Sequence, residues 1–353
     1  MDINNKKVWQ IAAGDTDRNF ADLCLKWDVI LNGPGSEGKW PECRMILEKD
    51  WGLSSKKLMD IQRFAEMIED GDIVVLRIGT TDILGVGVVV GGYEWHDEFG
   101  DIDGWDLQHF RRVRWIWRYN GTPKVFAAYS LKFGDTTQLL DSEAVLDWIK
   151  SIPTNQDDLT RVIKQLPKPS HDATIDQIAD NLFDKGVAGN AINSFTGSID
   201  ELIHIARWYQ RSGIRPSESE TVTYLVIPLL RALGWTPQKM AVEWNNVDIA
   251  LFKTLPRDNA NLSAVLEAKQ KDRSCLNAKS QAQYYAEQPG RDSCSRLIVT
   301  DGIRYGIYFK KDGKFQYHPD AYLNITKMRD AYPVLNCLGA KDAFLFMSAD
   351  WDS

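Results

Sequence analysis

The chain has 353 residues, of which 44% are hydrophobic, enough to bury the cores of two domains. Its formal net charge of −7 argues against a protein that coats DNA by bulk attraction, and its five scattered cysteines argue against a disulfide framework or a CxxC zinc site. No apolar run is long enough to span a membrane and the first residues are polar, so the sequence predicts a cytoplasmic protein.

Residues 1–153 predict a small β-barrel with helices packed on it, because short apolar runs alternate with turn residues. Strands are expected at 8–14, 29–31, 71–77, 83–90 and 111–115, and helices at 20–25 and 58–68. Nine of the chain's 13 tryptophans lie in this segment, more than a core of this size needs. Some of them are therefore candidates for binding.

The N-terminal pattern resembles the PUA-like superfamily, in particular the EVE and YTH domains and related modified-base readers that are fused to nucleases. The resemblance is carried by Trp9–Gly14, Gly71–Val74, Gly85–Gly87 and Arg112–Trp115. It implies a domain that takes a base out of its stack and holds it between aromatic side chains. The candidate pocket residues are Trp27, Asn32, Trp40, Trp95, Arg114 and Trp115, with Asn32 reading a base edge. Each tryptophan is equally compatible with ordinary packing.

Residues 154–197 predict a helical linker between two domains. The segment is polar, it is broken by Pro167, Pro169 and three glycines, and helical patterns occur at 159–166 and 175–182. A further helix at 199–209 is expected to belong to a C-terminal domain, 198–353.

Acidic residues mark three consecutive elements of the C-terminal domain. Glu218 and Glu220 stand in the first turn of a helix that ends near Gly234. Asp248 lies in an apolar strand after an Asn-Asn turn, where a carboxylate needs a partner or a metal ion.

The next strand, 264–269, alternates so that Glu267 and Lys269 share one face. Asp248, Glu267 and Lys269 are therefore expected to meet across neighbouring strands.

This set of side chains suits hydrolysis of a phosphodiester. Mg²⁺ prefers carboxylate oxygens, which Asp248 and Glu267 would supply, and Mn²⁺ is expected to substitute for it. The Lys269 ammonium would help the attacking water to lose a proton and would stabilise charge on the phosphate, with Glu218 assisting.

The same segment resembles the PD-(D/E)XK nuclease superfamily, most closely the nuclease domains of type I restriction motor subunits. Four features carry the resemblance: Ser-Glu-x-x-Thr from 217, Val-Asp-Ile-Ala-Leu from 247, Leu-Glu-Ala-Lys from 266 and Gln-Ala-Gln-Tyr-Tyr-Ala from 281. The resemblance implies a restriction-endonuclease-like α/β core, a metal ligand from the carbonyl of Ala268, and Gln281 and Tyr285 on a helix that backs the site and contacts DNA. It favours Glu218 for the helix acid, since Glu220 is also explained by the helix dipole.

Together the two halves predict a modification-dependent, type IV-like DNA restriction endonuclease that serves in defence against phage. Lys and Arg number 18 against 25 acids in residues 1–153 and 20 against 17 in 201–353, which favours a selective reader joined to a basic nuclease. DNA with a modified base is the expected partner, a homodimer is expected for double-strand cutting, and no nucleotide cofactor is expected because a phosphate-binding loop is absent. An RNA-directed nuclease and a noncatalytic nucleic-acid-binding module remain alternatives.

Overall fold

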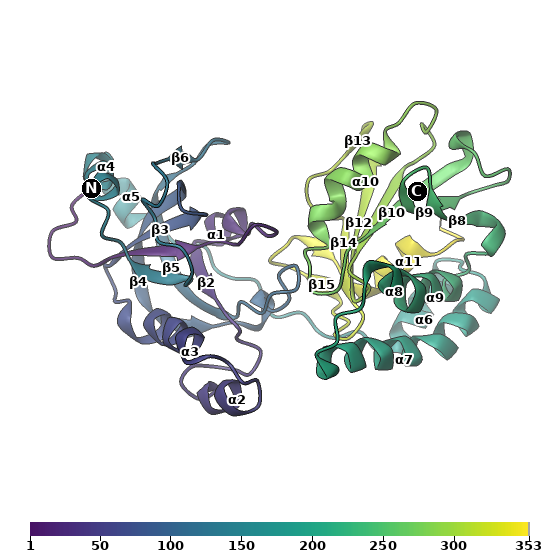
Figure 1. Ribbon diagram of the computed structural model, residues 1–353, viewed down its shortest axis with the longest axis horizontal. Helices are drawn as coiled ribbons and strands as arrows, with labels where there is room; N and C mark the ends of the chain where they lie inside the picture. Colours follow the sequence, from purple (N-terminus) through teal and green to yellow (C-terminus); the bar gives the residue numbers. More distant parts are fainter. Residues whose placement is uncertain (352–353) are drawn as a thin grey trace. The chain divides into compact units, whose positions relative to one another are not determined.

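The computed structural model describes residues 1–351 and divides the chain into two compact units, residues 1–168 and 169–353 (Figure 1). Each unit has one β-sheet with helices packed against it, so the prediction of a two-domain mixed α and β protein is confirmed. Within residues 1–351, no helix has the length and apolar character that crossing a bilayer requires.

The first unit is built on a seven-stranded sheet of order β2-β5-β4-β3-β1-β7, with β6 paired to β4; β1 and β3 are parallel and the other pairs antiparallel. The strands are β1 (Val8–Ala12), β2 (Val29–Asn32), β3 (Ile73–Ile78), β4 (Asp82–Trp95), β5 (His109–Arg118), β6 (Lys124–Val125) and β7 (Thr137–Leu139). The helices are α1 (Ala21–Trp27), α2 (Arg44–Lys49), α3 (Ser55–Gln62) with a π-helical extension (Arg63–Met67), a 3₁₀ turn (Asp97–Phe99), α4 (Glu143–Ser151) and α5 (Gln156–Thr160).

This sheet curls until its two edge strands approach each other. The Asn32 side-chain amide at the end of β2 donates a hydrogen bond to Thr137 Oγ1 at the start of β7, at 3.2 Å. The backbone ladder nevertheless ends at β2 and β7, so the sheet is a half-barrel closed by side chains, where the sequence predicted a barrel.

The glycines of β4 allow β5 to pack closely against it. A Cβ atom on Gly87 would lie 2.5 Å from Val113 Cγ1 and 3.0 Å from the ring of Trp115. Any larger residue would push these strands apart, which gives the Gly85–Gly87 motif a packing role.

The predicted linker is divided between the two units. Residues 154–168 pack on the first unit, where the Arg161 guanidinium binds both carboxylate oxygens of Asp28. Residues 169–197 belong to the second unit, because helix α6 (Ile175–Asp184) and the start of α7 (Gly189–Ser212) bury their apolar faces in its core. The helix predicted at 159–166 is wrong beyond Thr160, since residues 161–171 have no regular structure.

The second unit contains a nine-stranded sheet of order β15-β16-β14-β12-β11-β10-β9-β8, with β13 paired to β12. Its strands are β8 (Met240–Trp244), β9 (Val247–Phe252), β10 (Leu262–Ala268), β11 (Arg296–Thr300), β12 (Arg304–Lys311), β13 (Lys314–Phe315), β14 (Ala321–Asn324), β15 (Ala331–Tyr332) and β16 (Cys337–Leu338). Besides α6 and α7, its helices are α8 (Glu218–Thr221), a π-helical segment (Val222–Val226), α9 (Ile227–Ala232), α10 (Lys279–Ala286) and α11 (Ala340–Met347), with 3₁₀ turns at Pro237–Lys239, Asn259–Asn261 and Leu276–Ala278.

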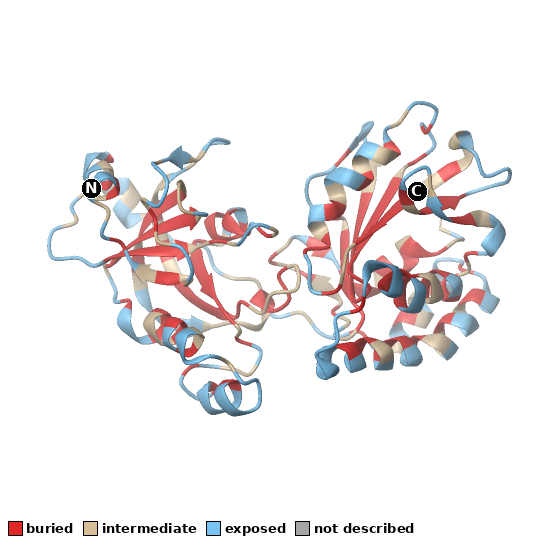
Figure 2. Cartoon of the chain, in the orientation of Figure 1, coloured by how far each residue is buried: buried red, intermediate tan, exposed pale blue. Residues whose placement is uncertain are grey.

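Strand β10 lies inside this sheet and its two faces have different partners. Ala264, Leu266 and Ala268 point into the larger core, which α6, α7, α9 and α11 complete. Val265 points to the opposite face, which is covered by Ala278, Ala282 and Ala286 around α10. The central strands are buried along their length (Figure 2). Glu267 and Lys269 therefore lie on the α10 face.

Candidate functional site

Asp248 and Glu267 lie side by side where β9 begins and β10 ends. Ile249 pairs with Leu266, so the next position along places Asp248 opposite Glu267. The Asp248 Oδ2 atom accepts the backbone N–H of Ala268 at 2.7 Å, and the Asp248 N–H donates to Glu267 Oε1 at 3.4 Å. These contacts fix two carboxylates on one face of neighbouring strands, as the sequence predicted.

The Glu267 carboxylate is the most strongly perturbed acid of this group. Its side chain is fully buried, and its Oε2 atom has no hydrogen-bond partner. Burial, reinforced by the charge of Asp248, raises the pKa of Glu267 to about 8 from its ordinary value of 4.5. In this environment the carboxyl group needs either a proton or a cation near neutral pH.

Lys269 follows β10 and is held by helix α10. Its backbone N–H donates to the Thr300 carbonyl on β11, and its ammonium donates to Gln281 Oε1 at 3.0 Å. The Gln281 amide in turn donates to the Tyr285 hydroxyl at 3.5 Å. Gln281 and Tyr285 thus form a chain of polar contacts that positions the lysine, a role that the sequence alone did not specify.

The two acids at the start of α8 have different partners. Glu220 completes a capping box: its carboxylate accepts the Ser217 N–H at 2.8 Å, while Ser217 Oγ accepts the Glu220 N–H at 3.1 Å. Glu218 is not part of the cap. Desolvation raises the pKa of Glu218, the Lys269 ammonium lowers it and Asp248 raises it, so its carboxyl group lies within electrostatic reach of both.

A hydrogen bond joins the α8 end of the site to the sheet. The Gln270 side-chain amide donates to the Pro216 carbonyl at 3.1 Å, which ties the residue after Lys269 to the turn before α8. Sequence reasoning missed Gln270, because its partner is a backbone carbonyl 54 residues away.

The residues present fit a hard divalent cation. Glu267 offers a buried oxygen without a partner, and Asp248 offers a second carboxylate beside it. The N–H and carbonyl of one strand residue point to the same side, so the Ala268 carbonyl faces β9, as its N–H does. Across residues 1–351 no three His, Cys, Asp or Glu side chains gather as a metal site, so the protein ligands would be two carboxylates and a carbonyl.

Two residues expected to line a base pocket, Trp115 and Arg114, have partners within the protein. Trp115 is buried, its indole N–H donates to the Cys24 carbonyl at 3.3 Å, and its ring packs on Gly85 and Gly87, so it is a core side chain. The Arg114 guanidinium donates to the Arg161 carbonyl at 3.0 Å. Trp27 is half-buried at the end of α1, with the Lys26 ammonium 5.2 Å from its ring centre.

Asn32 lies in the seam that closes the half-barrel, which we define as Asn32, Lys57, Asp60 and Thr137. Besides its bond to Thr137, the Asn32 side-chain oxygen accepts the Gly33 N–H and the Lys57 ammonium. Asp60 accepts the Lys57 ammonium at 2.9 Å and the Thr137 N–H at 2.8 Å. The expectation that Asn32 reads a base edge is therefore corrected: its buried amide is largely satisfied within the protein.

Trp40 and Trp95 lie near the same end of the sheet. Tyr93 accepts the Trp40 backbone N–H and donates to His109 Nδ1 at 2.7 Å, so His109 Nε2 carries the proton that the Pro34 carbonyl accepts at 3.0 Å. Burial lowers the pKa of His109 to about 4, which keeps the ring neutral. Trp40 itself is buried, and its indole donates to Glu66 at 2.7 Å.

Trp95 is half-buried and pairs across the sheet with His109, the partner of Asn32. Its indole N–H donates to the Gly35 carbonyl at 2.8 Å. Trp95 thus stands beside the seam with part of its ring exposed. The sequence missed Lys57 and Asp60, whose contacts depend on how α3 packs on the sheet, and it missed Tyr93 and His109, which the pairing of β4 with β5 brings together.

We expect Trp115→Ala to lower the unfolding free energy of the first unit by about 3–5 kcal/mol, because it empties a packed site on the β4 glycines. Trp51→Ala is the matched control, since Trp51 is 46% exposed and surface changes cost about 0.5 kcal/mol or less. Urea unfolding followed by circular dichroism measures both variants. Equal stabilities would contradict the assignment of Trp115 to the core.

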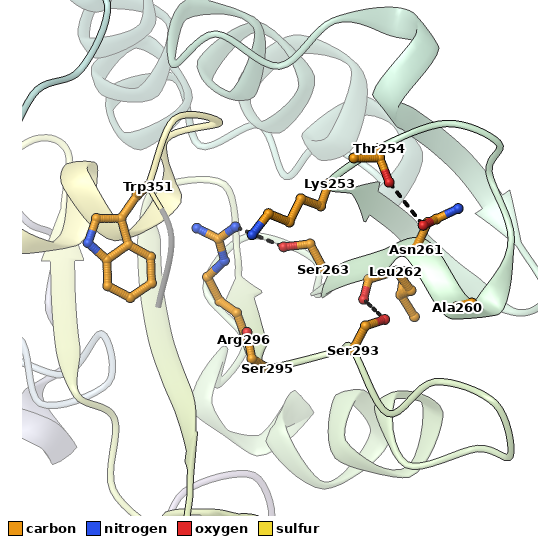
Figure 3. A pocket seen from close by; sticks show the side chains of 10 residues that line it. All are labelled: Lys253, Thr254, Ala260, Asn261, Leu262, Ser263, Ser293, Ser295, Arg296 and Trp351. Atoms are coloured by element: carbon orange, nitrogen blue, oxygen red, sulfur yellow. Dashed lines mark hydrogen bonds between the residues drawn. The ribbon is translucent and has the colours of Figure 1, made fainter.

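A separate cavity of about 300 Å³ lies at the other end of β10 (Figure 3). It is lined by Lys253, Thr254, Ala260, Asn261, Leu262, Ser263, Ser293, Ser295, Arg296 and Trp351. The Arg296 guanidinium donates to Ser263 Oγ at 3.4 Å and lies 5.6 Å from the Trp351 ring centre. None of the predicted site residues lines this cavity, since its β10 residues, Leu262 and Ser263, lie at the start of the strand and Glu267 lies near its end.

Comparison with known proteins adds little to this geometry. Residues 9–137, from β1 to the start of β7, match the model of a family described as a domain of unknown function, DUF8426. No curated protein matches the chain. Among solved structures, a fragment described as an HsdR subunit of a type I restriction enzyme from Vibrio vulnificus YJ016 is similar at 22% identity and a TM-score of 0.23. The match covers 29% of this chain and 23% of that chain, a likeness too small to carry an argument about either unit.

Proposed function

We propose that the second unit is a Mg²⁺-dependent nuclease of the PD-(D/E)XK type and that the first unit is a PUA-like domain that selects its DNA substrate. One observation carries the nuclease assignment: a buried glutamate with an unpaired oxygen lies against Asp248, on the same sheet face as Lys269. Two acids and a lysine in this order suit phosphodiester hydrolysis more than they suit fold stability, because the unpaired oxygen costs stability. Metal-dependent cleavage of DNA is the direct test.

In this proposal Asp248, Glu267 and the Ala268 carbonyl hold Mg²⁺, which would stabilise the charge that develops on the phosphate oxygens. The Lys269 ammonium, held at 3.0 Å from Gln281, is positioned to orient the attacking water and to assist its loss of a proton. Glu218 lies within reach of the same lysine from the start of α8. The hydroxyl of Tyr285 supports Gln281 and thereby the lysine.

The first unit would supply selectivity. Its surplus of acidic residues makes bulk attraction to phosphate weak, so DNA would have to be recognised at particular positions. Trp95 combines partial exposure with a fixed ring, and it remains the candidate wall for a base that is turned out of the helix. A modified base is the proposed target, and defence against phage DNA is the proposed use.

We expect a chain that begins at Pro169 to fold and to cut DNA without preference between plain and modified substrates. The reason is that residues 169–353 contain a complete core together with every proposed catalytic side chain. Circular dichroism checks the fold, and cleavage of matched plain and cytosine-modified duplexes checks the preference. A truncated chain that keeps the preference of the full chain would assign recognition to the nuclease unit.

A further inference from the structure

Two aromatic side chains project from the segment that joins β6 to β7. Tyr129 is 83% exposed and Phe133 is 82% exposed, the highest values among the exposed aromatic side chains of the described chain. Neither contributes to a core, and Tyr129 also has a left-handed backbone with φ of 63°. Both rings are therefore available to a binding partner at the surface.

The loop that carries these rings is firmly anchored. Leu131, midway between them, is fully buried in the core of the first unit, and its N–H donates to the Thr80 carbonyl at 3.1 Å. The buried Gln10 side chain accepts the Lys132 N–H at 2.9 Å and donates to the Lys132 carbonyl at 3.0 Å. Because the backbone is fixed, little conformational entropy is lost when the rings meet a ligand.

The charge of this segment differs from that of the rest of the unit. Residues 119–134 contain Lys124 and Lys132 and no acidic residue, although acids outnumber basic residues across residues 1–153. The Lys132 ammonium pairs with Asp141 and donates to the Leu139 carbonyl at 2.9 Å, and both contacts are solvent-exposed and weak enough to exchange for a phosphate. Lys124 is exposed, with its ammonium 5.5 Å from the Phe126 ring centre.

The loop also lies next to the seam of the half-barrel. Asp135, two residues after Phe133, forms ion pairs with Lys56 at 3.3 Å and Arg63 at 2.9 Å. Lys56 is the chain neighbour of Lys57, which binds Asn32 in the seam. The aromatic loop and the seam therefore share one side of the unit.

We propose that residues 124–133 form a nucleic-acid contact in which Tyr129 and Phe133 stack on bases and Lys124 and Lys132 bind the adjoining phosphates. Aromatic rings with interspersed lysines are the combination that single-stranded nucleic acid binds, because every base has a face to stack and every nucleotide carries a phosphate. The inference rests on the proposed function for the identity of the ligand. The loop contact is a second site for the nucleic acid on the first unit, separate from any pocket that holds a turned-out base.

The test measures binding apart from cleavage. The full chain is titrated, in EDTA, into a fluorescein-labelled 16-nucleotide single strand of DNA, the matching duplex and an RNA of the same sequence, with fluorescence anisotropy as the readout. Tyr129→Ala/Phe133→Ala is expected to weaken binding of the single strand at least tenfold, since stacking is worth about 1–3 kcal/mol per base. Tyr129→Phe keeps a ring and is expected to bind like the unaltered chain.

Two further variants make the result specific. Lys124→Ala/Lys132→Ala is expected to weaken binding and to reduce its dependence on salt concentration. Trp51→Ala removes an exposed ring from another surface of the same unit and is expected to change nothing. Unaltered binding by the folded Tyr129→Ala/Phe133→Ala chain overturns the proposal. So does a lack of binding to all three probes by the unaltered chain. If the unaltered chain binds through this loop but cleaves no substrate, the nuclease assignment is refuted and the loop contact stands.

Discussion

Lys269→Ala should lower the rate of DNA cleavage by about 100- to 1000-fold, the usual cost of removing one group that stabilises a charged transition state. The ammonium lies on the same face as Glu267 and is fixed by Gln281, so its loss removes the positive charge nearest to the two carboxylates. Its side chain is only half-buried and contributes little to the core, so the variant should fold and bind DNA. Single-turnover cleavage measures the rate, and anisotropy in EDTA measures the binding.

Lys279→Ala is the matched control for that variant. Lys279 also donates to a glutamine, Gln283, at 2.6 Å, and it lies on the same helix as Gln281. The control should keep the rate of the unaltered chain within a fewfold. A Lys269→Ala chain that cuts as fast as the Lys279→Ala chain would remove Lys269 from the mechanism.

Glu267→Gln should abolish cleavage and at the same time make the metal-free protein more stable above neutral pH. The substitution keeps the shape of the side chain but removes a charge that is buried with an unpaired oxygen. The folded-state pKa of Glu267, about 8, is above its ordinary value of 4.5, so the folded chain holds this proton more tightly than the unfolded chain does. Stability of the metal-free protein therefore falls as pH rises from about 4.5 to about 8.

The size of this effect follows from the shift, at about 1.4 kcal/mol for each pKa unit, and is on the order of a few kcal/mol. Urea unfolding at pH 5.5 and pH 8.5, with EDTA and with Mg²⁺, measures it. The unaltered chain should lose stability at pH 8.5 in EDTA and regain it in Mg²⁺, whereas Glu267→Gln should lose much less stability at pH 8.5 and gain much less from Mg²⁺.

Glu220→Gln serves as the control for the loss of an acid. Glu220 is exposed and accepts a hydrogen bond in the α8 cap, so its replacement should cost roughly 1 kcal/mol at most without altering the Mg²⁺ response. If Glu267→Gln destabilised the metal-free chain at pH 8.5, the buried carboxylate would have to be paired in a way that this structure does not contain.

The sequence located the elements of the candidate nuclease site because local rules govern them. Alternation along β10 placed Glu267 and Lys269 on one face, and Asn245 and Asn246 form the left-handed turn that begins β9. The bonds of Lys269 to Gln281 and of Gln270 to Pro216 depend on how helices dock on the sheet. The spacing of residues in the sequence does not predict how the helices pack on the sheet, so these two hydrogen bonds could not be predicted.

The first unit was harder to read from its sequence, because tryptophan serves both packing and binding. Trp115 and Trp40 are apolar residues in apolar surroundings, and the structure places both of them inside. The aromatic loop with Tyr129 and Phe133 gave no periodic signal, and only the exposure of its rings on an anchored backbone singles it out. The sequence assigned 154–197 to a linker, but residues from Ala173 to Phe195 contribute apolar side chains to the core of the second unit. A helix that is apolar on one face only is hard to distinguish from a linker helix when the surface it packs against is unknown.

The most direct test of the nuclease assignment is cleavage by the full chain with Mg²⁺, with Mn²⁺ and with EDTA, on plain DNA, DNA with modified cytosines and RNA. We expect cutting of modified DNA that requires a metal ion, that EDTA stops, and that Glu267→Gln and Lys269→Ala lack. Cutting that persists in EDTA, or no cutting of any substrate together with no effect of Mg²⁺ on stability at pH 8.5, would contradict the metal site formed by Asp248 and Glu267.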